Sequence, residues 1–150
     1  MINGVEFKEL ITYPDHRGYF RELLRNSDNT AKEGIGQISH SLVHAGVVKA
    51  WHAHKKEEKY FFCVEGSCQI SCVAVNNFKN PNKSSKIYSW VLSDQKPEII
   101  FIPKGYANGS MNFSINTKIL VFSSSTLQQS ASDDYRYPFD YWNPWSIIKR

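Results

Sequence analysis

The sequence lacks a long hydrophobic run. None of its segments approaches the roughly 18 consecutive apolar residues that a membrane-spanning helix needs. Its first five residues, MINGV, also lack the charged and apolar regions of a signal peptide. We therefore expect a protein that does not enter a membrane and that works in the cytoplasm.

Cysteine is scarce as well. The three cysteines, Cys63, Cys68 and Cys72, lie close together, and their odd number argues against a disulfide framework. Their spacing matches no zinc motif. Because Cys68 and Cys72 are an even number of residues apart, a strand would place them on one face. We expect the cysteines to be small buried apolar residues.

No stripe of positive charge runs along the chain. Its 18 Lys and Arg residues outnumber 14 Asp and Glu residues, which gives a formal net charge of +4, but the basic residues are scattered. This pattern argues against binding to a nucleic acid. It suits a small anionic ligand better, such as a diphosphate held by a few cations.

Helix signals are also few, and residues 28–33 are the one segment that indicates a short helix. Strand-forming residues are abundant, since 9 Phe, 8 Tyr and 4 Trp residues make up 14% of the chain. Short segments rich in Val, Ile, Phe and Tyr alternate with Gly, Pro, Asn and Asp turns, which predicts one all-β domain over residues 1–150, an antiparallel sandwich or jelly roll. The expected strands are 5–13, 18–25, 37–43, 47–54, 59–64, 68–75, 87–92, 99–102, 110–113 and 119–123.

Two segments fall outside this strand pattern. Residues 76–86 form a polar stretch that we expect to be a mobile loop. Residues 134–145 are aromatic and interrupted by proline, and we expect them to cover a sheet end or a partner subunit.

The segment around His52 carries the densest group of chemically useful residues. His52 and His54 are two apart on a predicted strand, so their side chains share a face, and Glu58 follows. With residues 103–112, this segment resembles the paired motifs of the cupin superfamily, whose fold is a double-stranded β-helix, the cupin jelly roll. In metal-binding cupins the positions of His52, His54 and Glu58 bind a divalent ion, and Asn108 stands at the position of a third histidine. Alternatively, hydrogen bonds inside the barrel satisfy the two histidines.

A narrower resemblance covers nearly the whole chain. Six segments, in the same order, are similar to motifs of the dTDP-4-dehydrorhamnose 3,5-epimerase family. The resemblance implies a nucleotide-sugar epimerase without a cofactor, acting on a dTDP-4-keto-6-deoxyhexose in deoxysugar or polysaccharide biosynthesis. The N-terminal strand and the aromatic tail indicate a homodimer. The matching segments are residues 4–5 with 15–22, 37–41, 49–52, 59–61, 102–109 and 136–144.

Epimerisation next to a ketone removes a proton from carbon and returns one to the opposite face. It needs a base with a pKa near neutrality, a cation or donor for the enolate, and an acid opposite the base. The resemblance implies that His52 is the base and that Lys59 holds the enolate oxygen or a phosphate. Arg17 could instead form a surface ion pair with Asp15. The implied substrate-binding residues are Arg17, Glu22 and Gln37, which would recognise the nucleotide, with Lys49, His54 and Asn108.

The chain departs from the family pattern at four places. Ala74 occupies the position of an aspartate that the family couples to its histidine, and residues 123–129 contain no tyrosine to act as the opposite acid. Lys49 replaces an arginine, and Asn108 replaces the second pocket histidine. The nucleotide-sugar pocket is therefore better preserved than the two-sided proton machinery.

Four functions stay open at this point. The first is a dTDP-sugar epimerase, acting at one carbon or at two. The second is a dTDP-sugar 3,4-ketoisomerase, which the run from His52 to Lys55 also resembles and in which His52 and His54 would relay a proton. The third is a non-catalytic nucleotide-sugar-binding protein, and the fourth is a metal-binding cupin.

Overall fold

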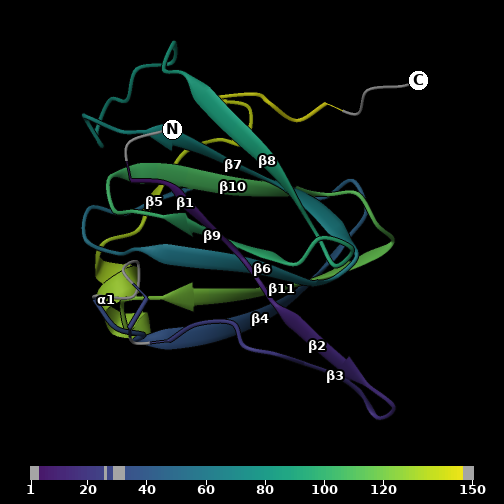
Figure 1. The fold of residues 1–150 in the computed structure, drawn as a ribbon. Helices are drawn as coiled ribbons and strands as arrows, with labels where there is room; N and C mark the ends of the chain where they lie inside the picture. Colours follow the sequence, from purple (N-terminus) through teal and green to yellow (C-terminus); the bar gives the residue numbers. More distant parts are fainter. Residues whose placement is uncertain (1–3, 26, 29–32, 147–150) are drawn as a thin grey trace.

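The computed structural model describes residues 4–25, 27–28 and 33–146, and it shows two five-stranded antiparallel sheets that face each other (Figure 1). This confirms the all-β prediction. The first sheet has the order β1 (Glu6–Glu9), β9 (Glu98–Ile102), β6 (Lys59–Glu65), β11 (Asn116–Ser123) and β4 (Gln37–His44). The second has the order β12 (Tyr135–Arg136), β5 (Val48–Ala53), β10 (Tyr106–Asn112), β7 (Ser67–Ala74) and β8 (Ile87–Ser93). A separate hairpin of β2 (Thr12–Asp15) and β3 (Gly18–Arg21) projects away from both sheets (Figure 1).

The central strands of the first sheet, β9, β6 and β11, carry buried apolar residues on both of their faces. On β6, Phe61 and Cys63 point into the core between the sheets, whereas Tyr60 and Phe62 belong to a second cluster with Leu10. Since neighbouring strand residues point to opposite faces, two buried faces require a continuous apolar run, which is why β6 reads YFFC and β9 reads IIFI. Leu23 and Leu24 pack against this second cluster from the N-terminal part of the chain.

The aromatic C-terminal tail packs on the second sheet. Trp142 is 2% exposed and makes an edge contact with Trp51 of β5, with ring centroids 5.5 Å apart. The polar segment 76–86 is tied to this tail, because three ring donors reach its backbone carbonyls. Tyr137, Tyr141 and Trp142 donate hydrogen bonds to the carbonyl oxygens of residues 78, 81 and 82. The expected loop is therefore present but anchored.

Three local expectations differ from the structure. The single strand expected over residues 5–13 is divided into β1 and β2, and β10 begins at Tyr106 instead of residue 110. A helix, α1 (Leu127–Ser132), lies where none was predicted. Its signal was the capping box, in which the Thr126 hydroxyl accepts from the backbone of Gln129 and the Gln129 side chain reaches back. The helix expected over residues 28–33 lies largely outside the described residues.

Cys63, Cys68 and Cys72 are free and buried in the core between the sheets, which confirms their prediction as small apolar residues. Burial raises the pKa of the Cys72 thiol to about 12. No helix in the described ranges is long and apolar enough to cross a membrane. The organisation of residues 1–150 as one domain stays a prediction.

We expect the tail to contribute strongly to the stability of the fold. Replacing Trp142 with alanine removes a buried ring and its hydrogen bond, and should lower the free energy of unfolding by about 3–5 kcal/mol in chemical denaturation. Phe139 lies in the same tail but is 58% exposed, so Phe139→Ala should change the free energy of unfolding by less than about 0.5 kcal/mol. Equal effects of the two variants would contradict this assignment.

Candidate active site

A cavity of about 180 Å³ lies between the two sheets. It is the place where the predicted His52, Lys59, Lys49 and Asn108 come together, because β5 and β10 of one sheet face β6 of the other across it. Apolar side chains form much of the rest of the wall. The remaining lining residues are Ser41, Val43, Phe61, Gly109, Ser110, Ile119 and Val121.

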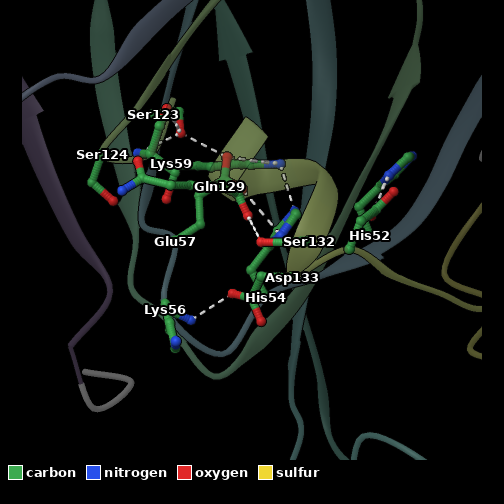
Figure 2. Close-up of polar contacts among 12 residues, drawn as sticks. His52, His54, Lys56, Glu57, Lys59, Ser123, Ser124, Gln129, Ser132 and Asp133 are labelled. Carbon is green, nitrogen blue, oxygen red and sulfur yellow. Dashed lines mark hydrogen bonds and ion pairs between the residues drawn. The ribbon is translucent and has the colours of Figure 1, made fainter. Parts of the chain in front are cut away.

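His52 is paired with a carboxylate that the sequence analysis did not identify. Its Nδ1 lies 3.6 Å from Oδ1 of Asp134, and Figure 2 shows His52 apart from the other labelled residues. Oδ1 is buried and accepts no hydrogen bond from the described residues, whereas Oδ2 accepts one from Arg136 Nε at 2.7 Å. The carboxylate behind the histidine thus comes from Asp134, and not from the strand position of Ala74. The adjacent acids Asp133 and Asp134 ahead of the aromatic tail were the signal in the sequence.

This geometry assigns the proton state of His52. A carboxylate at Nδ1 favours the tautomer with the proton on that nitrogen, which leaves Nε2 as the free base. Burial lowers the pKa of His52, and the positive charges of Lys59 and Arg136 lower it further, against the opposite effect of Asp134. His52 is therefore neutral at pH 7 and able to accept a proton.

His54 belongs to a buried network instead of the cavity wall. Its side chain is 3% exposed and does not line the cavity. Its Nε2 lies 3.0 Å from Nζ of Lys59, and its Nδ1 lies 3.1 Å from Oε2 of Glu57 (Figure 2). The Ser123 hydroxyl donates to the other Glu57 oxygen at 2.7 Å. Glu57 and Ser123 were not identified from the sequence. The signal for Glu57 was its position, because it is an acidic residue among lysines and close to two histidines.

The three residues that a metal-binding cupin would use do not converge. No group of His, Cys, Asp or Glu side chains able to hold a metal ion is present among the residues described. The Lys59 ammonium lies at the His54 nitrogen that would have to bind a cation. Glu58 lies elsewhere, and its carboxyl has a raised pKa because of burial, opposed by the charge of Lys104.

Lys49 and Asn108 occupy the wall that carries His52. Asn108 is the direct partner of His52 in the register between β10 and β5, and it is 7% exposed. The Lys49 ammonium donates a hydrogen bond to the Ser41 hydroxyl at 2.9 Å. Two ammonium groups, those of Lys49 and Lys59, therefore line one small cavity, which suits an anionic ligand.

The residues predicted to recognise the nucleotide do not line this cavity within one chain. Arg17 lies at the turn of the projecting hairpin, 78% exposed, and pairs with Asp15 at 2.6 Å, which was the alternative considered for it. Glu22 forms an ion pair with Arg25. Gln37 is the first residue of β4.

Comparison with known proteins gives consistent matches. The family described as dTDP-4-dehydrorhamnose 3,5-epimerase matches residues 1–138. The spore coat polysaccharide biosynthesis protein SpsL of Bacillus subtilis is 30% identical over 141 residues, which cover 93% of this chain and 91% of SpsL. The solved dTDP-4-dehydrorhamnose 3,5-epimerase of Sulfolobus tokodaii has a TM-score of 0.82 at 23% identity, covering 97% of this chain and 82% of its own. The RmlC epimerase of Legionella pneumophila, in complex with dTDP-4-keto-L-rhamnose, has a TM-score of 0.81 at 16% identity, covering 100% and 82%. These likenesses confirm the cupin jelly roll.

The charges around His52 predict how its titration responds to mutation. In a ¹⁵N NMR titration we expect its pKa below the ordinary histidine value of about 6.5. Asp134→Asn should lower the pKa further because it removes a negative charge, whereas Arg136→Gln should raise it because it removes a positive one. A wild-type pKa above 6.5, or shifts of the same sign in both variants, would refute the assignment.

Proposed function

Because the chain belongs to the dTDP-4-dehydrorhamnose 3,5-epimerase family, we propose that it epimerises a dTDP-4-keto-6-deoxyhexose, with His52 as the base. The observation that carries the proposal is the His52–Asp134 pair at the edge of a small cavity lined by two lysines. A neutral histidine with a carboxylate behind it is suited to accept a proton from carbon. The pathway is the biosynthesis of a polysaccharide or another deoxysugar-containing glycan.

The chemistry follows from the ketone of such a sugar. The carbonyl at C4 acidifies the hydrogens on C3 and C5, so a base can remove one of them and leave an enolate. His52 Nε2 takes that proton, and Asp134 stabilises the imidazolium that forms. The Lys59 ammonium, on the opposite wall, supplies positive charge for the enolate in a cavity where few other charges compete.

The same residues support a nucleotide sugar as the ligand. Lys49 and Lys59 offer two cations to a diphosphate or an enolate, and Asn108 offers an amide to sugar hydroxyls. His54 is engaged by Lys59 and Glu57, so the contacts do not favour the two-histidine relay of a 3,4-ketoisomerase. No step requires a cofactor. The cytoplasmic location stays a prediction.

We also propose that the protein is a homodimer in which the hairpin β2–β3 lies on a second copy. Among the described residues the hairpin pairs with no other strand, and Tyr19 and Phe20 on it are about 65% exposed. An isolated two-stranded hairpin is marginally stable in water. The first sheet ends at β4, a long edge strand with exposed Ile38 and Leu42, and open edges of this kind recruit further strands.

This arrangement would also complete the nucleotide site. Ser41 and Val43 of β4 line the cavity, so a hairpin seated along the β4 edge would arrive beside it. Arg17 and Glu22 of one copy would then contribute to the cavity of the other, which accounts for their distance from the site within one chain.

Incubation with dTDP-4-keto-6-deoxyglucose in deuterated water tests the reaction. We expect deuterium at C3, C5 or both, followed by NMR, and a loss of at least about 100-fold in the rate for His52→Ala because it removes the general base. Val91→Ala is the control, since Val91 is exposed on β8, outside the cavity and far from the β4 edge in the sheet order.

Each of the other possible outcomes would indicate a different function. Stabilisation by dTDP without exchange would indicate a non-catalytic nucleotide-sugar-binding protein, and a 3-keto product would indicate a ketoisomerase. Stoichiometric iron or manganese that is lost in His54→Ala would indicate a metal-binding cupin.

The dimer is tested by the mass of the protein in solution. We expect twice the chain mass by light scattering for the wild type, and the mass of one chain for Leu42→Lys, which places a charge on the β4 edge. Val91→Lys on β8 is the control, because Val91 is 59% exposed and far from the proposed interface in the sheet order. A monomeric wild type, or a dimeric Leu42→Lys variant, would refute the arrangement.

A further inference from the structure

Inversion of a carbon centre needs two proton-handling groups on opposite sides of the substrate. His52 can remove a proton from one face, but returning it from the same nitrogen would restore the original configuration. The second group must therefore reach the substrate from the other wall of the cavity.

The cavity offers few groups that could do this. Three of its lining residues carry a titratable side chain, namely Lys49, His52 and Lys59. Lys49 and His52 share strand β5, so both belong to the same wall. Lys59 begins β6 in the facing sheet. Among the described lining residues, Lys59 is thus the titratable group that comes from the sheet facing the base.

The Lys59 ammonium is held by a buried chain of polar groups. It lies 3.0 Å from His54 Nε2 and 3.5 Å from Oε1 of Glu57 (Figure 2). The Glu57 side chain is 1% exposed, and Ser123 donates to the same oxygen. Since an ammonium can only donate, His54 Nε2 must be the acceptor in this contact.

This direction of donation also fixes where the proton of His54 lies. With Nε2 accepting, the proton of neutral His54 sits on Nδ1, which lies 3.1 Å from Oε2 of Glu57 without the alignment of a hydrogen bond. The hydrogen bonds from Lys59 to His54 and from Ser123 to Glu57 are both consistent with this protonation state. Together these contacts hold the ammonium at the cavity wall.

We propose that Lys59 is the proton donor to the sugar face opposite His52, and that Glu57 and His54 are the residues that position it. The assignment rests on the proposed epimerase function. His52 takes the proton from carbon, the C–H electrons form the enolate, and an N–H bond of Lys59 breaks as the new C–H bond forms on the other face. The ketone is restored, His52 is left protonated and Lys59 neutral. After product release, water takes the proton from His52 and returns one to Lys59.

Lys59→Arg and Lys59→Gln test the donor role in deuterated water with dTDP-4-keto-6-deoxyglucose. Arginine keeps the positive charge but does not give up its proton, and glutamine has neither. In both variants we expect the inverted product to fall at least about 100-fold. Deuterium should still enter the unconverted substrate through His52 in Lys59→Arg, which keeps the charge that stabilises the enolate, whereas Lys59→Gln should lose part of this exchange as well. Unchanged thermal stability and dTDP binding would establish that the variants are folded.

Other roles of Lys59 predict other combinations of exchange and inversion rates. Equal loss of exchange and inversion in Lys59→Arg, or inversion preserved in that variant alone, would show that the lysine acts only on the enolate, and inversion preserved in both variants would remove it from the reaction. Either result overturns the assignment. A wild-type protein without any exchange would overturn the proposed function itself, which is a different result.

The positioning residues have a readout that does not depend on turnover. ¹⁵N NMR of His54 should show the proton on Nδ1 in the wild type, and Glu57→Gln should reduce this preference and lower inversion more than exchange. His54 with its proton on Nε2 in the wild type would contradict the hydrogen bond from Lys59 to His54 and so the positioning role of His54.

Discussion

The three central strands of the first sheet, β9, β6 and β11, carry large apolar side chains on both faces, so the outer face of this sheet needs a cover that the facing sheet cannot supply. The same holds for the second sheet around Trp51. The N-terminal part of the chain, with Leu23 and Leu24, covers one outer face, and the aromatic tail with Trp142 covers the other. Burial of both faces is thus what holds the two ends of the chain against the sandwich and keeps the strands of the cavity walls in register.

Two carboxylates give the cavity its chemical character. Asp134 stands behind His52, and Glu57 stands behind His54 and Lys59. A buried carboxylate is costly unless hydrogen bonds and opposite charges surround it, and both acids have such partners. The result is a neutral imidazole on one wall and an ammonium on the other, which is the asymmetry that proton transfer across a substrate requires.

The sequence predicted what depends on local pattern. The all-β class, the strand carrying His52 and the buried cysteines follow from residue spacing, and all are present in the structure. Asp134 could not be assigned to His52, because the two are 82 positions apart and their contact depends on how the tail returns to β5. The orientation of His54 was also out of reach, since its position on a strand fixes the face but not the partner. Helix α1 was overlooked although its capping box is visible in the sequence.

The carboxylate behind the base is carried by the segment that leads into the aromatic tail. Asp134 directly precedes β12, which pairs with β5, and the tail continues from there to Trp142 and Trp145. His52 therefore gains its carboxylate partner only when this segment docks on β5. Local opening of this segment would separate Asp134 from His52 and so disable the base, which ties the lifetime of the working site to the docking of the tail.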